Sequence, residues 1–112
     1  MRMWNVPVEQ MCRKHLMGEH VETHMFVGTM NAAKSLKGYI DKGLIEVDLL
    51  ESRHEELAKE IERRGYNHNS PLIISPLVLV QYEGLGKVDS QNSLDELARR
   101  CEECAELQAK AL

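Results

Sequence analysis

The sequence predicts an all-α protein, a compact domain of three helices over residues 1–112 with an irregular connection between the second and third. Its 112 residues are 43% hydrophobic and 29% charged, which is typical of one soluble globular domain rather than a disordered chain. The core must be built from Leu, Ile, Val, Met and Ala, which favours helix packing over a β-sandwich. The chain has only five aromatic residues, Trp4, Phe26, Tyr39, Tyr66 and Tyr82.

The first helix is predicted over residues 7–34. Pro7 suits a first helical turn, where its missing N–H is not needed. The apolar side chains that follow share one sector at 100° per residue. They are Val8, Met11, Cys12, Leu16, Phe26, Val27, Met30 and Ala33. Residues 38–43 then interrupt the pattern, with room for one helical turn between two glycines.

The second and third helices are predicted from their end signals. Asp48 begins the second helix in a loose capping box, and Arg63-Arg64-Gly65 ends it with cations in the last turn and glycine just after it. The third helix begins near Ser93 and carries an apolar stripe toward the C-terminus. Between them, residues 67–91 hold two prolines and two glycines. This segment is expected to be irregular or to form a short helix that packs over the core.

Two charged residues, Glu19 and Arg53, lie inside the apolar stripes of the first two helices. A lone buried charge is very costly, so we expect them to pair across the helix interface. The alternative is that they position the side chains of a functional site without contacting the ligand themselves.

The charge distribution argues against a wrapping, non-specific DNA binder. Acids outnumber bases by 18 to 14, for a net charge of −4. Residues 1–43 nevertheless carry six bases against four acids, whereas the remainder carries eight bases against fourteen acids. An anionic ligand is therefore expected at the N-terminal third.

The three cysteines are too few for a secreted disulfide framework. Cys101 and Cys104 form a single CxxC, predicted to lie inside the third helix, and a zinc site needs four ligands. We therefore interpret the cysteines as structural and predict no metal. No signal peptide is recognised, and the longest apolar stretch, residues 71–80, falls short of the about 20 residues of a membrane span. These features predict a cytoplasmic protein without a membrane partner.

The histidines leave one alternative open. His20 and His24 are spaced i, i+4 on a face that we expect to be more exposed. Together with a glutamate or His54 they could bind a metal and form a metal-dependent hydrolase. No HExxH signature supports this reading. His15 and Glu22 lie two helical turns apart along one edge of the stripe.

The motif His15-Leu16-Met17-Gly18-Glu19-His20-Val21-Glu22, followed by Gly28, resembles the first helix of the phage-type pyrimidine-dimer DNA glycosylases, small all-α repair enzymes. The stretches 53–57 and 63–67 resemble the second helix of that family, and a weaker match runs through residues 88–105. The resemblance thus covers most of the chain, with specific motifs in the first two helices.

The resemblance implies a cofactor-free DNA glycosylase with associated lyase activity on abasic sites, acting on damaged double-stranded DNA with pyrimidine photodimers as the expected lesion. In that family the N-terminal α-amine attacks C1′ and forms a Schiff base, and a helix-1 glutamate moves protons. These roles fall on Met1 and Glu22. Because Arg2 is bulky, the initiator methionine is expected to remain. An α-amine titrates at roughly 7.7–8.0, so part of it is neutral near pH 7.

The expected substrate and DNA contacts are Arg2, Lys14, His15, His20 and His24. Val21 and Met25 stand where the family has arginines, and the family's basic aromatic tail is missing. Phosphate contacts, and with them the salt dependence of binding, should therefore be reduced. These departures also leave open a non-enzymatic helical interaction module on the same fold.

Overall fold

The computed structural model describes residues 1–112 and contains only helices, turns and irregular segments. The predicted all-α class is therefore confirmed, whereas the count of three helices is wrong, because the structure has six α-helices and two 3₁₀ turns. In chain order these are η1 (Val8–Gln10), α1 (Arg13–Asn31), α2 (Lys37–Asp41), η2 (Val47–Leu49), α3 (Leu50–Arg63), α4 (Pro76–Leu79), α5 (Ser90–Arg100) and α6 (Glu102–Lys110).

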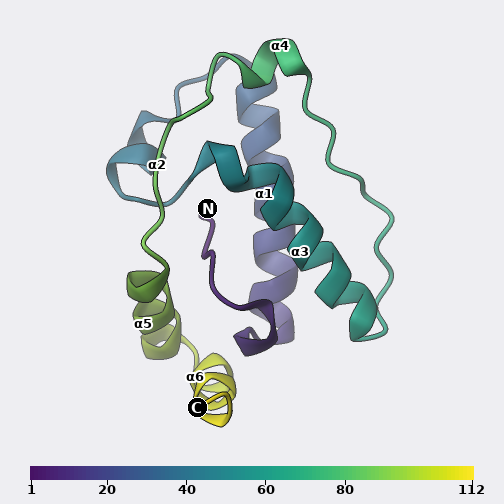
Figure 1. Ribbon diagram of the computed structural model, residues 1–112, viewed down its shortest axis with the longest axis vertical. Helices are drawn as coiled ribbons and strands as arrows, with labels where there is room; N and C mark the ends of the chain where they lie inside the picture. Colours follow the sequence, from purple (N-terminus) through teal and green to yellow (C-terminus); the bar gives the residue numbers. More distant parts are fainter.

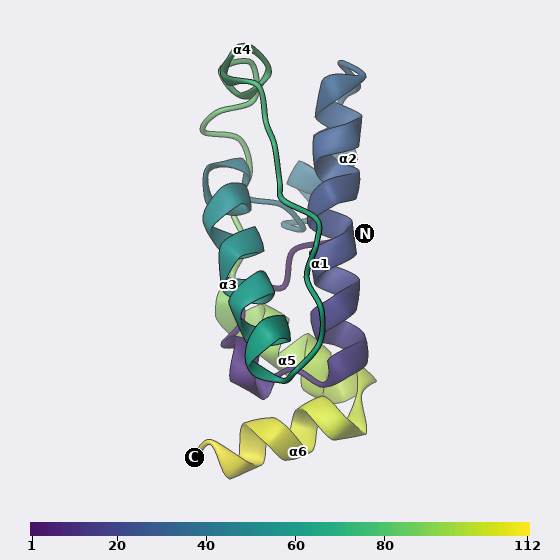
Figure 2. The same cartoon turned by 90° about the vertical axis from the view of Figure 1, so that its right-hand side faces the viewer.

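The two long helices α1 and α3 lie side by side and form the centre of the molecule (Figures 1 and 2). The short helix α4 covers one end, and α5 and α6 cover the other, where α6 contacts η1. The molecule is flat, with extents of 42 × 31 × 17 Å. The N-terminus lies in the middle of this arrangement, while the C-terminus lies at the α6 end (Figure 1). None of the helices combines the length and apolar character of a membrane span.

The first helix begins later than predicted, at Arg13 rather than Pro7. Met11 and Cys12 adopt extended backbone between η1 and α1. The reason is tertiary: the guanidinium of Arg64, the residue just after α3, donates to the backbone oxygens of Val8 and Met11, at 3.0 and 2.7 Å. The Met11 carbonyl therefore accepts a hydrogen bond from Arg64 instead of one from a helical amide, and the chain turns before α1 begins.

The second helix ends as predicted but begins two residues later. Gly65 follows α3 with a φ of +88°, the left-handed conformation expected of a glycine that ends a helix. Asp48 does not cap the helix. Its Oδ1 instead accepts a hydrogen bond from the Gly84 amide at 2.8 Å, which joins η2 to the distant connection.

The predicted third helix is two helices. Asp89 caps α5 through the Asn92 amide, four residues before the expected start. The backbone of Cys101 is extended, with φ −141° and ψ 114°, and it separates α5 from α6. The connection over residues 67–89 is irregular apart from the short α4, as predicted, and the last two residues of the predicted range, 90 and 91, already belong to α5. The helical turn expected between Gly38 and Gly43 is α2.

The hydrophobic core consists of two clusters along the α1–α3 pair. One cluster lies toward α4 and is centred on Phe26, Met30 and Leu50. The other lies toward α5 and α6 and includes Trp4 and Leu16. The N-terminal segment contributes to both, with Met3 in the first and Trp4 in the second, so folding draws this segment into the interior.

Candidate active site

The ion pair that the sequence predicts is buried between α1, α3 and the N-terminal segment, next to the candidate site. Arg53 on α3 donates from Nε and Nη2 to the two carboxylate oxygens of Glu19 on α1, at 2.7 and 2.8 Å. Both side chains are almost fully buried, and the expected pairing is confirmed. The third nitrogen, Nη1, donates to the Val6 carbonyl at 2.8 Å. The pair therefore joins α1 and α3 to the N-terminal segment.

A second contact holds the first residues in place. The Met3 amide donates to the Leu44 carbonyl at 2.7 Å, and the Met3 side chain is fully buried. With Met3 and Val6 both fixed, the chain start lies along α1. The α-nitrogen of Met1 is 4.0 Å from Oε1 of Glu22. This distance is an ion-pair contact, and it is too long for a direct hydrogen bond.

Met1 and Glu22 line the same cavity, of about 410 Å³. The cavity lies between the N-terminal segment, α1 and the end of α5. Its walls combine cationic, acidic and aromatic groups with the chain start. The lining residues are Met1, Arg2, Trp4, Lys14, His15, Gly18, Glu19, Glu22, Leu44 and Arg100. We call this cavity the N-terminal cleft. It brings together both predicted catalytic residues with Arg2, Lys14 and His15.

Arg2 is held on the wall of the cleft. Its guanidinium lies 3.8 Å from the centre of the Trp4 ring, and Nη2 donates to Ser93 Oγ at 3.1 Å. Its Nε is buried and has no protein partner. Burial lowers the pKa of Arg2, and the nearby Arg100 adds to the effect. The result is a fixed cation with an unused donor, next to a second cation.

His15 lies at the edge of the cleft. Burial lowers its pKa, and the neighbouring Lys14 lowers it further, which favours the neutral imidazole at neutral pH. The ring packs edge-to-face on Trp4, and Nδ1 lies 3.2 Å from Cys12 Sγ. One ring nitrogen is therefore directed at a thiol.

His20 and His24 lie outside the N-terminal cleft. The expected exposure is wrong for His20, which is only 8% exposed, because α3 and residues 67–70 cover that face of α1. Its Nε2 lies 3.1 Å from that of His54 and 2.8 Å from that of His68. The three nitrogens that could share a metal are thus those of His20, His54 and His68. Burial, with a smaller contribution from His54, lowers the pKa of His20 to about 4.

An aromatic and a cationic side chain of the cleft, Trp4 and Arg100, are among the lining residues that the sequence prediction of the site misses. Arg100 ends α5, and its guanidinium lies 6.0 Å from the centre of the Trp4 ring. The only signal in the sequence is the Arg99-Arg100 pair near the end of an amphipathic segment. No local spacing relates residue 100 to the chain start.

A family model described as pyrimidine dimer DNA glycosylase matches residues 1–74. The chain belongs to the pyrimidine dimer DNA glycosylase family. The match includes the N-terminal segment, α1 and α3, and every residue of the N-terminal cleft except Arg100. The family resemblance inferred from the motifs is thereby confirmed. No curated protein and no solved structure gives a significant match to the chain.

Proposed function

We propose that this protein is a DNA glycosylase with lyase activity that uses the α-amine of Met1 as its nucleophile and Glu22 as its acid–base group. The observation that carries the proposal is the 4.0 Å approach of the Met1 nitrogen to the Glu22 carboxylate inside a cleft with three cationic side chains. Membership of the pyrimidine dimer DNA glycosylase family supports pyrimidine dimers as the lesion.

In the first step the neutral amine forms a bond to C1′ of the damaged nucleotide. The glycosidic bond breaks, and its electron pair leaves with the base, which takes up a proton. The nitrogen then loses one of its two protons and keeps the other. The sugar ring opens as the C1′–O4′ bond breaks, O4′ takes up a proton, and the nitrogen and C1′ form a protonated Schiff base. A carboxylate at the position of Glu22 stabilises this cation and can return a proton to the ring oxygen.

In the second step Glu22 accepts the C2′ proton. The electrons of that C–H bond form the C2′–C3′ double bond, and the 3′ phosphate leaves with the electrons of the C3′–O bond. Water then hydrolyses the Schiff base and frees Met1. C1′ is shielded in stacked DNA, so the damaged nucleotide must leave the helix to reach the amine.

The cations of the cleft suit the backbone phosphates on either side of such a nucleotide. Arg2 and Lys14 are on the matched part of the chain, and Arg100 adds a third cation from α5. Guanidinium and ammonium groups bind phosphate oxygens and orient the duplex without reading sequence.

Borohydride trapping on DNA with an abasic site tests the nucleophile. Protein with a free N-terminus, verified by mass spectrometry, should form a reduced covalent adduct. Protein that is acetylated at the N-terminus or extended by a few residues should form none. An adduct that survives both changes would assign the chemistry to a lysine, and no adduct with any substrate would reject the proposal.

Glu22→Gln tests the acid–base role, because the amide keeps the shape but cannot accept a proton. Turnover on dimer-containing DNA should fall by about 10²- to 10⁴-fold. Glu51→Gln, an exposed glutamate on α3, is the matched control and should leave turnover unchanged. Equal rates for Glu22→Gln and the native protein would remove Glu22 from the mechanism.

The second candidate is a helical interaction module that retains the fold without the chemistry. Val21 and Met25, one turn apart on α1, are 54% and 52% exposed, which favours contact with a partner. This candidate predicts no adduct in the trapping experiment and a binding partner whose affinity falls in a Val21→Ser, Met25→Ser variant.

A further inference from the structure

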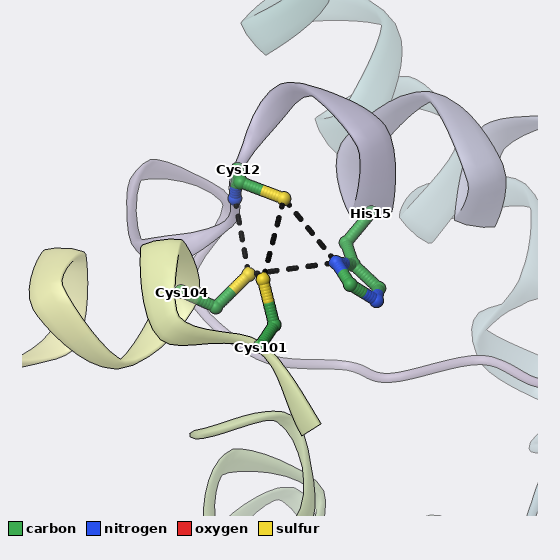
Figure 3. A group of neighbouring side chains, drawn as sticks. All are labelled: Cys12, His15, Cys101 and Cys104. Carbon is green, nitrogen blue, oxygen red and sulfur yellow. Dashed lines mark hydrogen bonds between the residues drawn. The ribbon is translucent and has the colours of Figure 1, made fainter. Parts of the chain in front are cut away.

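Four side chains with metal-binding atoms meet where the start of α1 contacts the start of α6. Cys12 and His15 come from the residue before α1 and its first turn, and Cys101 and Cys104 come from the residue before α6 and its first turn (Figure 3). Their three sulfurs and one ring nitrogen all lie within 4.8 Å of one another. The CxxC that the sequence predicts to lie alone inside a helix therefore has two further side chains with metal-binding atoms beside it, and it lies at a helix N-terminus.

The separations match those of ligands around one tetrahedral zinc ion. With Zn–S of about 2.3 Å and Zn–N of about 2.0–2.1 Å, tetrahedral angles place two sulfurs about 3.8 Å apart and a sulfur and a nitrogen about 3.6 Å apart. In the structure Cys12 Sγ lies 3.8 Å from Cys101 Sγ. His15 Nδ1 lies 3.2 Å from Cys12 Sγ and 3.7 Å from Cys104 Sγ.

The backbone presents both ligand pairs in the same way. Cys12 is the residue before α1 and Cys101 the residue before α6, and both have extended backbone there. In each case the second ligand lies three residues further on, in the first turn. The sequences are Cys-Arg-Lys-His and Cys-Glu-Glu-Cys. The break between α5 and α6 at Cys101 thus turns its thiol toward the other three groups.

The backbone supports one of the sulfurs directly. The Cys12 amide donates to Cys104 Sγ at 3.2 Å, the kind of support that orients a ligating sulfur. Three thiolates and a neutral imidazole around Zn²⁺ carry one net negative charge. Lys14 and Arg100, each next to a ligand in the chain and both lining the adjacent cleft, offset that charge.

Other pairings of these cysteines fit less well. A disulfide needs sulfurs about 2.05 Å apart, and all three cysteines are free. An iron–sulfur cluster contains several metal and sulfide atoms, so it needs more room than ligand atoms within 4.8 Å of one another leave. A mixed set of three sulfurs and one nitrogen is a common composition for structural zinc.

We propose that this protein binds one structural Zn²⁺ through Cys12, His15, Cys101 and Cys104. The ion ties α6, which lies beyond the matched residues 1–74, to the start of α1. All four coordination positions are taken by protein, and Cys12 and Cys104 are buried, so the site is closed. His15 binds through Nδ1, which fixes the ring against Trp4 and leaves Nε2–H on the side away from the sulfurs (Figure 3).

Elemental analysis of the full chain, purified under reducing conditions without added metal, tests the proposal directly. About one zinc per chain is expected, and native mass spectrometry should show the folded protein with the ion bound. Protein produced with cobalt in place of zinc should show the visible bands of tetrahedral Co²⁺ and sulfur-to-cobalt charge transfer in the near ultraviolet. Neither measurement depends on a variant that folds.

Variants then locate the ion. Cys101→Ser should reduce the zinc content at least tenfold and remove the charge-transfer band. His68→Gln changes the separate group formed by His20 on α1, His54 on α3 and His68 in the connection after α3, and this variant should retain both the zinc and the charge-transfer band. The proposal would be overturned by any of four results. The native protein could contain no metal, or its cobalt form could lack the sulfur charge-transfer band. The cysteines could form a disulfide, or zinc could be lost from His68→Gln and kept in Cys101→Ser. The zinc content is independent of borohydride trapping, so the two proposals can fail separately.

Discussion

Arg53 connects three parts of the molecule through one buried side chain. It pairs with Glu19 on α1, donates to the Val6 carbonyl and extends from α3. A buried pair of this kind contributes little net stability compared with apolar residues, but breaking it leaves a charge without compensation. Its main consequence here is positional, because it holds the N-terminal segment along the cleft.

Replacing Arg53 with methionine should therefore destabilise the fold strongly. Glu19 would be left buried and charged, and the cost should be about 3–5 kcal/mol in the free energy of unfolding. Urea denaturation measures this cost. The double variant Arg53→Met, Glu19→Gln should recover part of it, since no charge is then left alone. A single variant that costs under about 1 kcal/mol would contradict this account of the pair.

His20 should make stability depend on pH. Burial lowers its pKa from 6.5 to about 4 in the folded protein, so between these values the unfolded chain binds more protons. The contribution of His20 to the free energy of unfolding is therefore fully present above about pH 6.5 and decreases as the pH is lowered toward 4. Urea midpoints measured across this range should fall less steeply for His20→Gln than for the native protein. Parallel curves would show that His20 does not carry this dependence.

At the scale of elements, the helices are joined by close backbone contacts in the connections. Gly86 has a φ of +79°, and a Cβ built on it would lie 2.2 Å from the Ile45 carbonyl oxygen. The connection after α4 therefore packs directly on the chain before η2. The amide of Val47 reinforces this contact by donating to the Leu85 carbonyl at 3.0 Å.

Gly86→Ala should destabilise the protein by more than about 1 kcal/mol, because the new methyl group meets backbone and the positive φ is strained. Gly28→Ala is the control. Gly28 lies inside α1 with open space where the Cβ would be, so alanine there should raise stability by about 0.5–1 kcal/mol. Thermal unfolding of both variants measures the difference, and equal melting temperatures would contradict the close approach at Gly86.

The helix ends show which local signals can be trusted. The cations and glycine at Arg63-Arg64-Gly65 end α3 as predicted, because a left-handed glycine acts within its own turn. The starts of α1 and α3 differ from prediction because hydrogen bonds to residues far away in the sequence determine them. The Arg64 guanidinium donates to the Met11 carbonyl before α1, and the Gly84 amide donates to the Asp48 carboxylate, which therefore does not cap α3.

For the whole molecule, the net charge of −4 confines favourable contact with DNA to a small area. Residues 1–43 hold the excess of bases, as the sequence predicts, and the structure adds Arg100 from the far end of the chain. Arg2, Lys14 and Arg100 all line the cleft. Under the proposed function we therefore expect the duplex to bind there and to be repelled by the acidic remainder.

DNA affinity should therefore depend only moderately on salt. With three phosphates neutralised by these cations, the slope of log K against log salt should be about −2.7. Fluorescence anisotropy with a dimer-containing duplex at several salt concentrations measures it. Lys14→Ala should make the slope shallower by about 1. A slope as steep as that of 6–10 phosphate contacts would show a much larger DNA surface than the cleft.

The sequence alone determined the helical class, the motif of α1, the glycine that ends α3 and the pairing of Glu19 with Arg53. The helical class, the α1 motif and the end of α3 follow from local rules, since periodicity and capping involve neighbours along the chain. The pairing follows from the cost of burying a lone charge, which requires an opposite charge nearby whatever its position in the sequence. Only the tertiary structure brought Arg100 to Met1 and the Cys101–Cys104 pair to Cys12 and His15. Cys12 and Cys101 are 89 residues apart, and no local repeat relates positions so distant. Their meeting results from the packing of α6 against η1 and the residues just before α1.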